Sequence, residues 1–213
     1  MKLIIVRHGE TYENREGISQ GQKNSQLTES GVEQAKKVAV RLSSEKIDVI
    51  YSSDLDRAMH TAKEILQFHS NIALVPCKEL REQAKGVYEG LSRDVISEGV
   101  KSSELPYFKF RPLGGESMIE VFERTKIFFN DIKERHSDET VLLVSHGGPI
   151  GCVIAQAVNL PAMHYGKFCP RENTAVSVIE INNTGDETAK ADVVMFNSSD
   201  HLTAVTEIAS EYN

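Results

Sequence analysis

The stretch Leu3-Ile4-Ile5-Val6-Arg7-His8-Gly9-Glu10-Thr11 determines how this chain is interpreted, because a short apolar run ends abruptly in polar residues and a glycine. Such a run is typical of a buried β-strand that opens onto a loop. In open α/β sheets the strand ends line the ligand crevice. The sequence therefore predicts that Arg7 and His8 lie at the edge of a binding crevice.

The same pattern occurs a second time, and a third apolar run ends in serines and the start of a helix. Residues 141–144 run into Ser145-His146-Gly147-Gly148, and residues 48–51 run through two serines into a helix whose first turn carries Arg57. Three parallel strand ends would bring a group of basic and imidazole side chains to one crevice: Arg7, His8, Arg57 and His146. The chain as a whole is acidic, with a formal net charge of −7, so a group of cationic side chains in one crevice predicts an anionic ligand. Phosphate is favoured, since arginine binds its oxygens with a bidentate fork.

Length and composition bound the alternatives. A chain of 213 residues with 40% hydrophobic content suits one α/β domain over 1–213. No apolar stretch is long enough to cross a membrane, and a strand that begins at residue 3 leaves no room for a signal peptide, so a cytoplasmic location is expected. Three cysteines without close spacing indicate neither a disulfide framework nor a zinc site, and we expect them to be buried. The acidic balance argues against nucleic acid and anionic membranes as partners.

Hydrophobic periodicity predicts the elements around these strands. Helices are expected over 28–44, 55–68, 117–136 and 150–158, the first capped by Ser30 with Glu33 and the third by Ser117 with Glu120. Further strands are expected over 72–75, stopped by Pro76, and over 175–181 and 191–196, joined by a turn at 182–185. Residues 83–112 lose clear periodicity and carry several glycines and prolines. This segment is predicted to be an irregular, lid-like insertion with one or two short helices.

The motifs in this order resemble the histidine phosphatase superfamily, the phosphoglycerate-mutase-like family, over most of the chain. The resemblance rests on the segments at 7–11, 20–21, 27–28, 52–58, 80–82, 89–90, 115–117 and 145–147. It implies a three-layer α/β/α sandwich with a mostly parallel central sheet. It also implies phosphoryl transfer through a phosphohistidine, with no metal or organic cofactor.

The resemblance assigns roles to individual residues. His8 becomes the nucleophile, which suits a histidine on a rigid strand followed by Gly9, whose missing Cβ lets phosphate approach. The other catalytic positions are Arg7 and Arg57 as phosphate clamp, His146 as a hydrogen-bonding partner of the phosphoryl oxygens, and Glu82 as proton donor. Asn14, Gln20, Gly21, Gly147 and Asn173 match substrate-binding positions. Glu10, Thr11 and residues 115–117 are expected to be structural.

Some side chains are predicted to have no role. The other histidines lack metal-ligand spacing, and most of them are expected to face solvent: His60, His69, His136, His164 and His201. Arg81, Arg111 and Arg124 are expected at the surface, with a position in the pocket as the alternative.

Three functions remain open on sequence grounds. A phosphomonoester hydrolase acting on a small phosphorylated metabolite is favoured, because the insertion and tail are short for a cofactor-dependent mutase. The alternatives are a 2,3-bisphosphoglycerate-dependent phosphoglycerate mutase and a non-catalytic phosphate-binding protein. The expected ligand is the metabolite or inorganic phosphate, and the expected state is a monomer or homodimer. The chain has no tryptophan and carries Glu13 where the family frequently has one, so no substrate is assigned.

Overall fold

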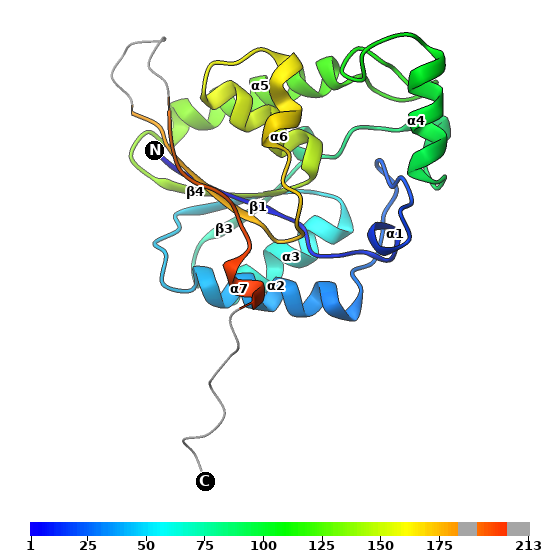
Figure 1. Cartoon of the computed structure of the whole chain (residues 1–213). Coiled ribbons are helices and arrows are strands. Elements are labelled where there is room, and N and C mark those ends of the chain that lie inside the picture. The colour runs from blue at the N-terminus through cyan, green and yellow to red at the C-terminus, as the bar shows by residue number, and fades with distance from the viewer. Residues whose placement is uncertain (183–190, 204–213) are drawn as a thin grey trace.

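A six-stranded sheet forms the middle layer of the computed structural model, which describes residues 1–182 and 191–203 (Figure 1). Its strands lie in the order β3-β2-β4-β1-β5-β6. The first four in this order run parallel, and β5 and β6 are antiparallel additions at one edge. The bounds are β1 Lys2–Arg7, β2 Val49–Ser53, β3 Ala73–Cys77, β4 Thr140–Ser145, β5 Val176–Glu180 and β6 Asp192–Ser198. Because β1 and β4 pair in register, Arg7 lies beside Ser145, and the residues that follow both strands emerge together.

Helices cover both faces of the sheet, which gives the predicted three-layer sandwich (Figure 1). One face is covered by α5 and α6, and the other by α2, α3 and α7. The α-helices are α1 Tyr12–Arg15, α2 Glu29–Leu42, α3 Asp56–Leu66, α4 Arg93–Ser102, α5 Met118–Arg135, α6 Gly147–Ala157 and α7 Asp200–Thr203. Three 3-10 helices complete the set, η1 Lys78–Leu80, η2 Gly86–Tyr88 and η3 Ala162–Phe168. The insertion contributes α4, which stands away from the sheet near α1, and we still predict that this segment acts as a lid.

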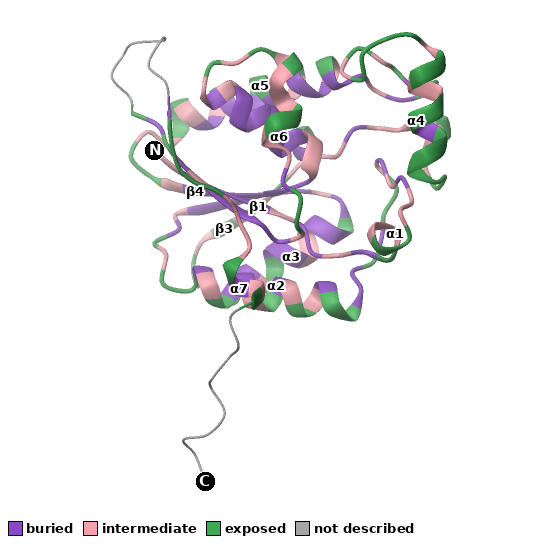
Figure 2. Cartoon of the chain, in the orientation of Figure 1, coloured by how far each residue is buried: buried purple, intermediate pink, exposed green. Residues whose placement is uncertain are grey.

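Strand alternation divides the core between the two faces. Leu3 and Ile5 of β1 pack in the cluster that contains α5 and α6, whereas Ile4 and Val6 pack in the cluster that contains α2 and α3. Figure 2 shows the central strands buried and the outer helix faces exposed. No helix in the described ranges is long and apolar enough to cross a bilayer.

Three local expectations were wrong. The N-cap of α2 is Thr28, whose Oγ1 accepts a hydrogen bond from the Gly31 backbone N–H at 2.9 Å, and Ser30 is an exposed first-turn residue. Strand β3 continues through Pro76, because β3 is at the sheet edge and one side of an edge strand needs no N–H donor. Helix α6 begins at Gly147 rather than near residue 150.

Other expectations were confirmed. Ser117 and Glu120 form the capping box of α5, and β5 pairs antiparallel with β6. Most of the turn predicted between these strands, 183–185, lies outside the described residues.

The expectation that the cysteines are buried was correct for one of them. All three are free thiols, but only Cys152 is fully buried, and Cys77 and Cys169 are partly buried.

The histidines outside the predicted site are less exposed than expected. His69 and His201 are buried, and His60, His136 and His164 are partly buried. His201 has partners for both ring nitrogens, at 3.0 Å from Thr174 Oγ1 and 3.0 Å from Arg41 Nη1. Hydrogen bonds to both ring nitrogens offset the free-energy cost of burying the imidazole. The spacing of histidines in the sequence does not reveal such hydrogen bonds.

The position of the α2 cap is testable by substitution. We expect Thr28→Ala to lower the free energy of unfolding by about 1–2 kcal/mol, because it removes an N-cap acceptor. Urea denaturation measures this. Ser30→Ala is the matched control and should change stability by less than about 0.5 kcal/mol, as exposed positions usually do. A larger loss for Ser30→Ala than for Thr28→Ala would contradict the assignment.

Candidate active site

The ends of β1 and β4 bring the two predicted catalytic histidines together. The backbone N–H of His8 donates to the Ser145 carbonyl at 3.0 Å, and the ring centroids of His8 and His146 are 5.0 Å apart. Both residues are buried, with 3% and 0% exposure. The predicted convergence of strand ends is therefore present in the fold.

A cavity of about 470 Å³ opens at these strand ends. Its lining includes most of the predicted site residues, namely Arg7, His8, Asn14, Gln20, Gly21, Arg57, Glu82 and Gly147. His146 and Asn173 lie behind this lining, where they contact Arg57 and His8 respectively. The remaining lining residues were not predicted, and most come from the insertion.

His8 is held in one neutral tautomer. Its Nδ1 lies 2.7 Å from the Gly9 carbonyl oxygen, which can only accept, so Nδ1 carries the proton and Nε2 keeps its lone pair. Burial, and then the charges of Arg57 and Arg7, hold the pKa of His8 well below its usual range. The ring is therefore neutral and available as a nucleophile in the cavity.

His146 is held in the opposite tautomer. Arg57 Nε donates to its Nδ1 at 3.2 Å, so the proton lies on Nε2, which donates to Ser53 Oγ at 2.8 Å. Burial and the neighbouring Arg57 lower the pKa of His146 well below its usual range. Because both ring nitrogens have protein partners, this histidine orients Arg57. Its direct bond to a phosphoryl oxygen stays a prediction.

Arg57 is fixed by the loop that precedes α2. Its Nη1 and Nη2 donate to the carbonyls of Lys23 and Gly21, each at 2.9 Å. The side chain is only 1% exposed, and burial lowers its pKa to about 10, so it remains a cation at neutral pH. Gly21 has φ +54°, and a Cβ there would lie 2.1 Å from Glu89 Oε1. The glycine therefore allows the close turn that holds the guanidinium.

Arg7 presents a free donor. Its Nη1 donates to the Arg171 carbonyl at 2.7 Å, while its buried Nε has no hydrogen-bond partner in the described part of the chain. Burial lowers the pKa of Arg7, although nearby Glu82 opposes the change. Arg7 and Arg57 both line the cavity, and two guanidinium groups suit the binding of a tetrahedral oxyanion.

The two asparagines support the loop after β1 in different ways. Asn173 Nδ2 donates to the His8 carbonyl at 2.9 Å and to Asn14 Oδ1 at 3.3 Å. Asn14 Oδ1 also accepts from the Thr11 N–H, so its own amide N–H groups remain for an anion. Asn173 thus supports the backbone of the nucleophile, and Asn14 is the one that lines the cavity.

Glu82 follows η1 and lines the same cavity as Arg7 and Arg57. Its Oε1 accepts from the Gln83 N–H at 2.8 Å, and its Oε2 is 3.5 Å from the Gly148 nitrogen. A Cβ at residue 148 would lie 2.6 Å from Glu82 Oε1. The second glycine after His146 therefore leaves the space that this carboxyl group occupies.

The sequence prediction missed an outer group of basic side chains. Lys85, Arg93 and Arg171 line the cavity, and Lys85 Nζ contacts the Tyr107 hydroxyl. Arg93 reaches the site because its backbone N–H donates to the Gly17 carbonyl at 3.0 Å, which joins the insertion to the loop after α1. No local pattern marks this pairing. The only available signal was a basic residue in the predicted lid.

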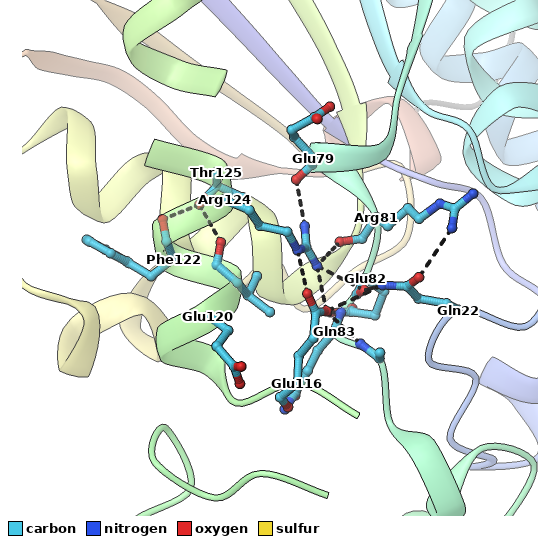
Figure 3. A network of polar contacts seen from close by, with 12 residues as sticks. Gln22, Glu79, Arg81, Glu82, Gln83, Glu116, Glu120, Phe122, Arg124 and Thr125 are labelled. Atoms are coloured by element: carbon cyan, nitrogen blue, oxygen red, sulfur yellow. Dashed lines mark hydrogen bonds and ion pairs between the residues drawn. The ribbon is translucent and has the colours of Figure 1, made fainter. Parts of the chain in front are cut away.

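The expected surface position of the three arginines holds for Arg111 only. Arg81 forms a bidentate ion pair with Asp54, with both N–O distances 2.6 Å. Arg124 is partly buried and contacts Glu116 and backbone carbonyls (Figure 3). Thr11, as N-cap of α1, and Glu116 are structural as expected.

The sequence profile of the histidine phosphatase superfamily (branch 1) matches residues 3–192. The chain belongs to this superfamily. Phosphoserine phosphatase 1 of Hydrogenobacter thermophilus is 34% identical, over 85% of this chain and 87% of the relative. The probable phosphoglycerate mutase GpmB of Cronobacter sakazakii is 38% identical, over 76% and 77% of the two chains.

A solved structure shows the same fold. Mycobacterial glucosyl-3-phosphoglycerate phosphatase is 27% identical, with a TM-score of 0.82 over 93% of this histidine phosphatase and 99% of that chain. That protein has also been solved with inorganic phosphate and with VO3. Among the residues described in our structure, no group of three or more His, Cys, Asp or Glu side chains is arranged to hold a metal ion.

The tautomers of the two histidines can be measured by ¹⁵N NMR. At about pH 6, where a histidine with the usual pKa near 6.5 is mostly protonated, we expect both rings to be neutral. The proton should be on Nδ1 in His8 and on Nε2 in His146. The urea-unfolded chain is the control, in which all histidines should titrate near 6.5. An Nε2 proton on neutral His8 would contradict the assignment.

Proposed function

We propose that this histidine phosphatase hydrolyses phosphomonoesters of small metabolites through a phosphohistidine formed at His8. The observation that carries the proposal is the Nδ1 bond of His8 to the Gly9 carbonyl at 2.7 Å, which leaves Nε2 unprotonated beside two arginines. A buried neutral imidazole next to fixed cations suits attack on an anionic phosphoryl group. Phosphatase names among its relatives support this choice.

In the first step, His8 Nε2 attacks phosphorus. The N–P bond forms while the P–O bond to the leaving group breaks, and Arg7 and Arg57 stabilise the charge on the remaining oxygens. The leaving oxygen takes a proton from Glu82, which lines the same cavity. No redox change occurs.

In the second step, water attacks the phosphohistidine. Glu82, now a carboxylate, accepts the proton of the water, the N–P bond breaks, and inorganic phosphate leaves. The lone pair returns to His8 Nε2, still with its proton on Nδ1. The site then has its starting protonation and needs neither a metal nor an organic cofactor.

The mutase alternative uses the same phosphohistidine. It differs because a substrate hydroxyl, rather than water, receives the phosphoryl group. Mutase activity is tested as well, because one relative is named as a probable phosphoglycerate mutase. Sustained isomerisation of 3-phosphoglycerate that depends on added 2,3-bisphosphoglycerate, without phosphate release, would establish it instead.

Removal of the nucleophile tests the proposal. We expect His8→Ala to lower phosphate release from a panel of metabolite monophosphates, assayed in EDTA, by at least about 1,000-fold, as loss of a covalent nucleophile does. Rapid acid-free quenching of the wild type should trap a phosphoprotein that is stable to alkali and labile to acid. His60→Ala, a partly buried histidine outside the cavity, is the control and should keep full activity. Metal-dependent turnover, or turnover that survives His8→Ala, would refute the phosphohistidine route.

We also infer that the preferred leaving group carries a negative charge. Lys85, Arg93 and Arg171 line the cavity in addition to the phosphate clamp, so the cationic character extends beyond one phosphate. A carboxylate on the leaving group would meet these side chains, and charge-assisted hydrogen bonds are the stronger kind.

Phosphoserine and phosphoethanolamine differ by one carboxylate and test this inference. We expect kcat/KM for phosphoserine to fall about 10-fold in Arg93→Ala, the scale of one hydrogen bond to a charged group, with a change below about twofold for phosphoethanolamine. Lys101→Ala, which lies on the same helix and outside the cavity lining, is the control. Equal losses on the two substrates would show that Arg93 does not recognise the carboxylate.

A further inference from the structure

We propose that Arg124 is a positioning residue that holds the proton donor Glu82 in place by binding its backbone, with Glu116 as its partner. The inference rests on the role given to Glu82 in the proposed function. Arg124 belongs to α5 and does not line the cavity, so it acts through another residue and not on the substrate.

Arg124 binds the carbonyl side of the segment that carries Glu82. Its Nη1 donates to the Glu79 carbonyl at 2.6 Å, and its Nη2 donates to the carbonyls of Arg81 at 2.7 Å and Glu82 at 3.1 Å (Figure 3). One planar guanidinium thus satisfies three carbonyls within four residues. Lysine cannot reproduce this fork, because its donors radiate from one point.

Glu116 binds the N–H side of the same segment and also binds Arg124. Its Oε2 accepts from the Ala84 N–H at 3.0 Å, and its Oε1 accepts from Arg124 Nε at 3.0 Å. Gln22 adds a third contact, because its Nε2 donates to the Glu82 carbonyl at 3.2 Å and to Glu116 Oε2 at 3.3 Å. Residues 79–84 are therefore held from both sides (Figure 3).

The backbone contacts matter because the hydrogen bonds of the Glu82 carboxyl group are either local in sequence or long. One oxygen bonds the N–H of the next residue, and the other is 3.5 Å from the Gly148 nitrogen. The location of the carboxyl group in the cavity is consequently set by where residues 79–84 run. The side chains of Arg124 and Glu116 are 18% and 24% exposed, so water competes little for their hydrogen bonds.

A displaced proton donor has a distinctive kinetic effect. An alkoxide is a poor leaving group and needs the proton from Glu82, whereas 4-nitrophenolate leaves as an anion without it. The value of kcat/KM covers steps up to phosphoryl transfer to His8, so later hydrolysis of the phosphohistidine does not affect the comparison. A general loss of folded enzyme would lower kcat/KM equally for both substrates.

The experiment measures kcat/KM for 4-nitrophenyl phosphate and for an alkyl phosphate in four variants. We expect Arg124→Ala to reduce the alkyl phosphate value by about 30- to 100-fold, the scale of a misplaced catalytic group, and the 4-nitrophenyl phosphate value by less than about threefold. Glu116→Gln, which keeps the side-chain shape and removes the charge, should show the same selectivity to a smaller degree. Arg135→Ala is the control, since Arg135 is an exposed arginine of the same helix paired with Asp131.

Glu82→Gln is the reference that separates the inference from its premise. Selective loss in Glu82→Gln and in Arg124→Ala supports the proposal. Selective loss in Glu82→Gln with equal losses, or no losses, in Arg124→Ala overturns it and leaves the proposed function intact. No selectivity in Glu82→Gln removes the proton-donor role and the inference together. If Arg124→Ala does not fold, as judged by circular dichroism, the same comparison on Glu116→Gln and Arg124→Lys decides.

Discussion

The burial of Arg57 is the constraint on which the site depends. Its guanidinium is 1% exposed, and the groups that accept its hydrogen bonds are two loop carbonyls and an imidazole nitrogen rather than a carboxylate. A buried charge with missing acceptors would be very costly, so the loop at Gly21 and Lys23 and the tautomer of His146 are both determined by it. The positive charge is thereby left uncancelled by a contacting anion. In the proposed function, this residual charge attracts the phosphoryl group to the cavity.

The contact between two histidines follows from the same arrangement. Parallel pairing of β1 and β4 places His8 and His146 side by side, and burial, with the charge of the fixed arginines as a second cause, keeps both rings neutral. Opposite tautomers then give them separate tasks. In His8 the lone pair is on Nε2, where the proposed function uses it to attack phosphorus, whereas in His146 it is on Nδ1 and accepts from Arg57.

The sequence predicted the parts of the fold that are governed by local chemistry. Apolar runs ending in polar residues, two of them followed by glycine, located the three strand ends, and the Ser117 and Glu120 pair located the start of α5. It failed where distant segments decide the outcome. Thr28 is the cap of α2 because the turn there is set by its bond to Glu10 Oε1 at 2.7 Å, and Pro76 is tolerated only because β3 is an edge strand. Neither Arg93 nor Arg124 belongs to a sequence motif. Arg93 lines a cavity formed by distant segments, and Arg124 donates to backbone carbonyls that are distant in the chain.

Burial of neutral imidazoles also makes the folding stability of this protein depend on pH in the acid range. His8, His146, His69 and His201 all have a pKa lowered mainly by burial, to about 4 for His201. The unfolded chain binds protons at these positions near its usual pKa of about 6.5, but the folded chain does not, so folding stability is intact above that pH and is lost as the pH falls below it. In the folded chain the lowered pKa of His8 keeps its ring unprotonated in this range, so acid acts on the folding equilibrium at a higher pH than the one at which this ring titrates. The same burial that keeps the His8 ring neutral thus makes the fold less stable in acid than at neutral pH.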